Sequence, residues 1–169
     1  MAPENNGLIG ELLGKYEHQA QVRWEFLTEE EKREWAWLAG IIDGEGCVSV
    51  KRRRDKKTGS LHYDLRLIVQ MTHEPTIKNI KRITSVGRIS TRSWQKPEWR
   101  LVYTWECGDR TAVSVLRCCL PYLVTKRAQA ILGMEFAEGQ EQGWPPSLAE
   151  LRKRDSIIQA ISLLNKRGV

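Results

Sequence analysis

The chain has 169 residues and a formal net charge of +6 at pH 7, which allows one compact domain with a full hydrophobic core. No apolar run is long enough to span a bilayer and no signal peptide is visible, so we expect a soluble, intracellular protein without a membrane partner. The four cysteines have neither C-x-x-C spacing nor suitably spaced histidines, and we expect them to be small apolar residues of the core rather than zinc ligands.

Positive charge is concentrated in the middle of the chain. Residues 47–102 contain fourteen Lys or Arg and four Asp or Glu, whereas the remainder contains thirteen basic and seventeen acidic residues. A basic segment between near-neutral flanks favours a surface for nucleic acid. A solvated charged face has the same composition and remains an alternative.

The N-terminal third contains one clear helix start. Residues 1–27 are mixed, and the spacing of their apolar residues indicates only a short amphipathic helix. Thr28 and Glu31 form a capping-box pair, and the acidic residues between them suit the positive end of a helix. This helix should continue for about four turns and end near the glycines Gly44 and Gly46.

Alternation with a period of two then predicts two hairpins separated by a helix. Strands are expected at 47–54 and 61–72, a helix at 74–84, strands at 86–94 and 99–107 around a turn at 95–98, and helices at 111–120, 125–139 and 147–166. The fold class is therefore α+β, with an antiparallel four-stranded sheet and helices on one face of it. We expect an N-terminal extension at 1–27 and a single domain at 28–169.

The solvent face of the predicted sheet is rich in arginine. Its candidates for DNA contact are Ser49, Lys51, Arg53, Arg66, Gln70, Arg88, Ser90, Arg92 and Arg100. Arg, Gln and Ser side chains bind base edges and phosphates, and a twisted β-ribbon fits the major groove of DNA. An ordinary wet sheet face is the alternative, but the charge asymmetry favours DNA.

Residues 38–46 read LAGIIDGEG. Gly40 and Gly44 share one helix face, where another helix could approach closely, and the carboxylates at the negative end of the helix favour a cation. A glycine-terminated helix with an exposed acidic residue explains the same letters. The segment resembles the signature of the LAGLIDADG homing endonucleases, with six of its nine letters in place. The order of elements and a later Pro121–Lys126 segment extend the resemblance over about residues 28–167.

The resemblance implies a homodimer, because chains with one motif obtain the second motif helix from another copy. The helices would meet through Leu38, Gly40, Ile41 and Gly44. The implied partner is double-stranded DNA with a long, palindromic or nearly palindromic target. The implied reaction is a staggered double-strand break by metal-dependent hydrolysis, serving intron homing in the cytoplasm or in an organelle that contains a genome. No small-molecule substrate is expected.

The resemblance also assigns roles to individual residues. Glu45 would be the essential metal ligand, one from each subunit, with the Gly44 carbonyl as a second ligand and Mg²⁺ as the ion. Lys126 would stabilise charge near the scissile phosphate or position water. His73 stands where relatives more often have a glutamine that bonds to the catalytic water network. Asp43 would have a structural part at the end of the motif.

Two other classes of function remain open. A non-cleaving nucleic-acid binder on the same scaffold, either an RNA maturase or a transcriptional regulator, would need neither Glu45 nor Lys126, so the presence of both favours cutting. A protein-interaction module built on the seven tryptophans is the other alternative, although most of them fit core or interface positions better.

Overall fold

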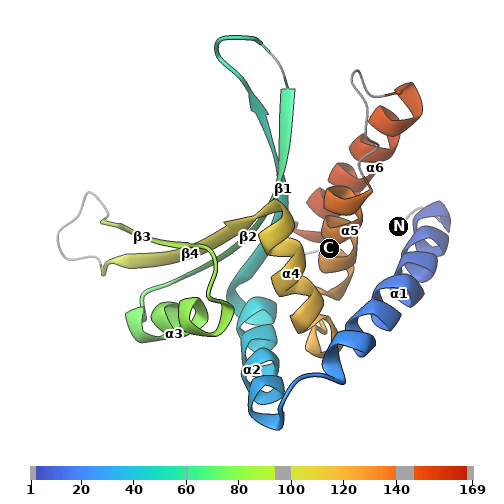
Figure 1. The fold of residues 1–169 in the computed structure, drawn as a ribbon. Helices are drawn as coiled ribbons and strands as arrows, with labels where there is room; N and C mark the ends of the chain where they lie inside the picture. Colours follow the sequence, from blue (N-terminus) through green and yellow to red (C-terminus); the bar gives the residue numbers. More distant parts are fainter. Residues whose placement is uncertain (1–2, 60, 94–99, 140–146, 167–169) are drawn as a thin grey trace.

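The computed structural model describes residues 3–59, 61–93, 100–139 and 147–166. The order of elements is α1 (Pro3–Trp24), α2 (Glu29–Glu45), β1 (Gly46–Arg54), β2 (Leu61–Met71), α3 (Glu74–Thr84), β3 (Arg88–Arg92), β4 (Val102–Gly108), α4 (Asp109–Cys119), the 3-10 helix η1 (Leu120–Tyr122), α5 (Arg127–Glu138) and α6 (Leu148–Leu164) (Figure 1). The α+β class and the order helix, hairpin, helix, hairpin, helices are confirmed. The expected turn at 95–98 lies outside the described residues.

The four strands form one antiparallel sheet in the order β1-β2-β4-β3. Val48, Leu67 and Cys107 lie in register across three strands and are buried, which identifies the face that packs on the helices. Helices α2, α4 and α5 contact β2 on this side. The β1–β2 hairpin projects away from the helices (Figure 1), and its residues 51–54 are exposed. Among the described residues, the other face of the sheet carries exposed side chains such as Lys51 and Arg53.

The capping box at the start of α2 forms as the sequence predicts. The Thr28 hydroxyl accepts the Glu31 N–H at 3.2 Å, and a Glu31 carboxylate oxygen accepts the Thr28 N–H at 2.8 Å. Such a cap stabilises a helix by about 1 kcal/mol. At the other end β1 starts without a loop, and a Cβ at Gly46 would lie 2.5 Å from the Ile42 carbonyl oxygen. The glycine permits this sharp junction, which holds Glu45 at its corner.

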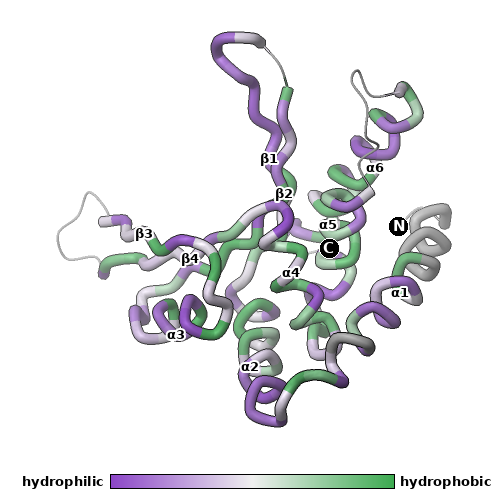
Figure 2. The backbone as a smooth tube through the Cα atoms, in the orientation of Figure 1, coloured by the Kyte–Doolittle hydropathy of each residue, from purple (hydrophilic) through white to green (hydrophobic). Residues whose placement is uncertain are grey.

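The N-terminal helix α1 belongs to the same hydrophobic core as the sheet. Leu12, Tyr16 and Ala20 are buried, and α1 contacts α4 and α5. The helix is longer than the sequence pattern indicated. Figure 2 shows polar residues along the β1–β2 hairpin as well.

The prediction for the cysteines is right for three and wrong for one. Cys107, Cys118 and Cys119 are buried, whereas Cys47 is exposed. Cys47 precedes the buried Val48, so the alternation of the strand directs its side chain to the opposite face of the sheet. Among the described residues, no helix has the length and apolarity needed to cross a membrane.

Candidate functional site

Asp43, in the last turn of α2, holds the segment that leads into α5. Its carboxylate accepts the N–H groups of Val124 and Lys126, each at 2.8 Å, and the Thr125 hydroxyl at 3.0 Å. These bonds satisfy backbone donors before the first turn of α5. The carboxylate is therefore occupied by the fold, in agreement with the structural part expected for it.

Lys126 reaches the end of the motif helix from 83 residues away in the sequence. Its ammonium donates to the backbone carbonyl of Asp43 at 3.3 Å, and the residue is half-buried. A cation is favoured here because α2 ends in uncompensated carbonyl dipoles and has no basic residue in its last turn. Lys126 therefore lies beside the turn that carries Gly44 and Glu45.

Glu45 contrasts with Asp43, although the two are separated by one residue. Glu45 is the last residue of α2 and is exposed. No ion pair or side-chain hydrogen bond joins it to any part of the chain that the structure describes. Gly44 is also exposed. Its carbonyl lies in the last turn of α2, where carbonyl groups accept no N–H from a later residue of the helix. This corner offers hard oxygen atoms of the kind that divalent cations such as Mg²⁺ prefer.

The donor set of one chain is too small to complete such a site. No group of three His, Cys, Asp or Glu side chains gathers for a metal within the described ranges. Mg²⁺ needs six oxygen ligands in near-octahedral geometry. Glu45 and the Gly44 carbonyl therefore fit as a half-site, which needs oxygen atoms from a second subunit, a phosphate or water.

Within the described residues, no packing contact explains the glycines on the exposed side of α2. Gly40 and Gly44 are exposed, and a Cβ at either would meet nothing within 4 Å. Glycine inside a helix costs about 1 kcal/mol relative to alanine. Ile41 is half-buried and Trp37 is 38% exposed beside them. A second body that approaches this face closely would explain both glycines.

Leu38 does not lie on this exposed face. Its side chain is 0% exposed, packed in the core of its own chain, and we leave it out of the candidate interface. Position 38 is one of the core positions of α2, because a helix places residues four apart on the same side and Ile42 is also buried. Trp37, which the sequence analysis assigned only broadly to core or interface, takes its place.

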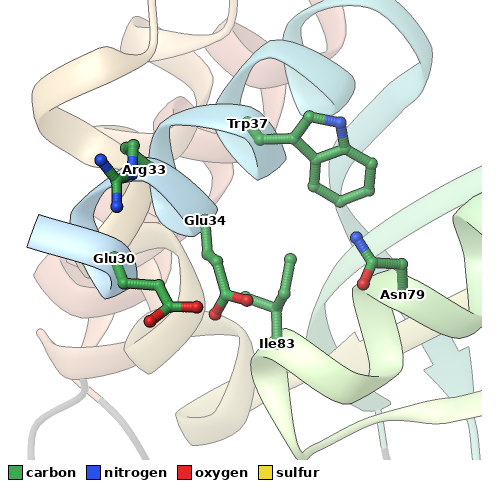
Figure 3. A pocket seen from close by; sticks show the side chains of 6 residues that line it. All are labelled: Glu30, Arg33, Glu34, Trp37, Asn79 and Ile83. Atoms are coloured by element: carbon green, nitrogen blue, oxygen red, sulfur yellow. The ribbon is translucent and has the colours of Figure 1, made fainter.

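A shallow hollow between α2 and α3 extends the exposed face (Figure 3). It is lined by Glu30, Arg33, Glu34, Trp37, Asn79 and Ile83. The hollow lies along the N-terminal half of α2, whereas Glu45 is the last residue of that helix. It therefore adjoins the candidate interface and is separate from the end of α2 at Gly44 and Glu45, which we call the acidic corner.

The candidate DNA-contacting residues share one face of the sheet, as their alternation predicts. Ser49 is opposite Arg66, and Gln70 and Ser90 are both opposite Thr104. Lys51, Arg53, Arg88 and Arg92 have the same parity in the register and are exposed. Arg100 is exposed and precedes β4. Glu106, opposite Arg88 on this face, was missed, although the alternation of β4 would have revealed it.

His73 stands apart from the acidic corner. It is exposed at the start of α3, where its Nδ1 lies 2.7 Å from the Thr76 hydroxyl. Within the described ranges no hydrogen bond or ion pair connects it to Glu45 or Lys126. Any part in water positioning stays a prediction.

Comparison with known proteins gives one consistent result. The model of the LAGLIDADG endonuclease family matches residues 38–109. The DNA endonuclease I-CvuI of Chlorella vulgaris is 27% identical over 141 residues, which cover 80% of this chain and 78% of the relative.

Solved structures show the same fold. The crystal structure of I-CvuI in complex with its target superposes with a TM-score of 0.69 and 21% identity, covering 84% of this chain and 87% of that one. The archaeal intron-encoded homing endonuclease I-Vdi141I, complexed with DNA, superposes with a TM-score of 0.67 and 18% identity, covering 83% and 89% of the two chains. Motif, family match and fold agree: residues 38–109 match the LAGLIDADG endonuclease family, and most of the chain is similar in sequence to I-CvuI and in fold to both endonucleases.

Proposed function

We propose that this protein is a site-specific DNA endonuclease that cuts both strands of its target as a homodimer. One observation carries the proposal: Glu45 is exposed and has no ion pair or side-chain hydrogen bond among the described residues, at the end of a helix that Lys126 contacts and whose glycine face meets no described residue. The relatives I-CvuI and I-Vdi141I are named as endonucleases and were solved with DNA, which supports the proposal.

The glycine face of α2 is the proposed dimer contact. Two copies of α2 would cross at Gly40, Gly44 and Ile41, with Trp37 at the edge of the contact. A twofold axis through this crossing places the two Glu45 carboxylates near each other and relates the two sheets by symmetry. The target would then be a palindrome or near-palindrome, because each half is read by an identical surface.

The acidic corner is the proposed cleavage centre. Glu45 and the Gly44 carbonyl would hold a hard divalent cation, which we take to be Mg²⁺ and which, when bound, activates water and stabilises the charge on phosphorus and the leaving oxygen. I-CvuI complexes were solved in the presence of calcium and of magnesium. Lys126 would stabilise charge on the phosphate, Asp43 would hold Lys126 in place, and His73 would bond to nearby water.

The outer face of the sheet is the proposed reading surface. Its arginines, with Gln70 and the serines, would contact bases and phosphates in the major groove on each side of the dimer axis. Cuts on the two strands, made by symmetry-related corners, would be staggered. Cleavage of such a long DNA target would suit intron homing. It would take place in the compartment that holds the target genome.

A cleavage selection tests the proposal. Randomised palindromic duplexes are incubated with the protein and Mg²⁺, with EDTA and the variant Glu45→Gln in parallel. We expect one long palindrome to be enriched among the cut molecules and to be absent from both controls. Cutting that persists with EDTA, or in the variant, would contradict the assigned centre.

A non-cleaving nucleic-acid binder is the second candidate, since the basic sheet face needs no catalytic corner. Recovery of a bound but uncut consensus from the same library would favour a regulator or a maturase. No consensus in either fraction would direct the same experiment to RNA. Retention of both Glu45 and Lys126 favours cutting.

A further inference from the structure

The outer face of the sheet contains two carboxylates among its arginines. Asp64 lies 3.9 Å from Arg53 and 3.6 Å from Arg66. Glu106 lies 3.9 Å from Arg66 and forms an ion pair and a hydrogen bond with Arg88. The five side chains form a continuous ladder across β1, β2, β4 and β3, which we call the arginine–carboxylate ladder.

The carboxylates of the ladder are more buried than its two outer arginines. The side chains of Asp64 and Glu106 are 20% and 13% exposed, whereas those of Arg53 and Arg88 are 72% and 75% exposed. Arg66 lies between the two carboxylates and is 33% exposed. The carboxylates therefore support guanidinium groups whose outer N–H donors remain available to a ligand above the sheet.

The central arginine of the ladder, Arg66, lies close to the backbone of the neighbouring strand. Arg66 is opposite Gly108 in the register, and a Cβ at position 108 would lie 3.4 Å from Arg66 Cδ. Its Nε is buried and has no hydrogen-bond partner among the residues that the structure describes. A Cβ at position 108 would thus be in van der Waals contact with Arg66, which lies close to the sheet between its two acids.

We propose that Glu106, assisted by Asp64, is a specificity-determining residue that positions Arg66 and Arg88 and weakens the binding of DNA of arbitrary sequence. The inference rests on the proposed DNA-binding function of this face. It adds acidic residues to a surface whose basic residues alone were expected to act.

The physical reason is the competition between carboxylate and phosphate for the same donors. Non-specific DNA binding comes from Lys and Arg that neutralise phosphates and release counterions. Two carboxylates among three guanidinium groups reduce the local charge from three positive to one positive. The same ion pairs restrict the guanidinium rotamers, which favours a bidentate contact with guanine over contact with any nearby phosphate.

The test measures the affinity of the Glu106→Gln protein for a random-sequence duplex over a series of salt concentrations. We expect tighter binding than wild type, on the order of five- to tenfold at low salt, and a salt slope steeper by about 0.9 for each arginine released to a phosphate. Affinity for a selected target should change less, so the ratio of specific to non-specific affinity falls. Asp64→Asn should act in the same direction.

Glu138→Gln is the matched control, because Glu138 forms an ion pair with Arg117 between α4 and α5, outside the sheet. It should leave affinity and salt slope unchanged. Unaltered or weaker binding of the random duplex by both Glu106→Gln and Asp64→Asn, with thermal unfolding like that of wild type, would overturn the inference. The measurement on the random-sequence duplex needs neither cleavage nor a known target, so its failure is distinguishable from failure of the selection.

Discussion

Two regions of the molecule hold carboxylates in opposite ways. At the junction of α1, α5 and α6, Glu135 is 6% exposed and accepts hydrogen bonds from Lys15 at 3.0 Å, Tyr16 at 3.2 Å and Lys153 at 2.7 Å. At the end of α2, Glu45 is exposed and has no such partner within the described ranges. The carboxylate of Glu135 is thus enclosed by donors of its own chain, whereas the carboxylate of Glu45 is accessible to solvent.

The difference shows how structural and functional charges can be told apart. A buried charge without partners is strongly destabilising, so the carboxylate of Glu135 is surrounded by donors. Burial is the main cause that raises the pKa of Tyr16, with the Glu135 charge next, so the phenol stays protonated and donates. Glu45 needs no such support in water, and its open position is useful only to a ligand that arrives from outside the chain.

The largest expected effect follows from removal of the exposed charge of Glu45. Glu45→Gln should lower the cleavage rate by roughly three orders of magnitude or more, because the variant would lose the proposed metal ligand from each subunit of the proposed dimer. Target binding should be kept within a few-fold, as measured by titration of a labelled duplex. Glu29→Gln, at the exposed start of the same helix, is the control and should cut normally. Equal loss of binding and cutting in Glu45→Gln would contradict the role.

Removal of the cation beside the motif end should have the next largest effect. Lys126→Ala should slow cutting by about a hundredfold, because one group that stabilises transition-state charge is lost. Affinity for the target should fall much less, since a single phosphate contact contributes little. Single-turnover kinetics separate the two quantities, and a fall in affinity as large as the fall in rate would make Lys126 a binding residue only.

The glycine face should be sensitive to bulk although the folded chain has room for it. Gly40→Leu should leave the subunit folded, with up to about 1 kcal/mol gained in helix propensity, but should shift the dimer to monomer and abolish cutting. Sedimentation velocity gives the oligomeric state. Gly14→Leu on α1, where a Cβ also meets nothing within 4 Å, is the matched control. A Gly40→Leu protein that still dimerises would move the interface elsewhere.

The closed region should show a smaller effect that depends on pH. Hydrogen bonds from Lys153 and Lys15 outweigh the burial that opposes them and lower the pKa of Glu135. Its stabilisation is therefore present above the usual pKa of a glutamate and is lost as pH falls through the lowered value. Glu135→Gln should be less stable than wild type by about 1–3 kcal/mol at pH 7, and thermal unfolding curves of the two should converge as pH falls through the lowered pKa of Glu135.

The exposed pair of Glu29 and Lys32 provides the comparison for this prediction. The hydrogen bond from Lys32 lowers the pKa of Glu29 as well, but both groups remain in contact with water. Glu29→Gln should therefore change stability little at any pH. A constant difference between Glu135→Gln and wild type from pH 7 down to the acid unfolding of the wild type would show that packing, and not the charge, is what the variant loses.

The sequence alone determined the elements and the motif. Each strand alternates with a period of two, so the faces of Val48 and Ser49 follow from the letters themselves. The capping box of Thr28 and the glycines of α2 are also local signals, because a cap and a helix face involve residues three or four apart. For the same reason the resemblance could be found in nine residues.

Only the tertiary structure decided which charges are used by the fold. Only the resemblance to a family gave Asp43 and Glu45 different roles in the sequence, and the contact that separates them physically comes from a segment 83 residues away. The burial of Leu38 in place of Trp37 and the ladder through Glu106 also depend on which elements meet. Such contacts join residues far apart in the chain, and the free energy that selects them is a property of the packed core rather than of any local pattern.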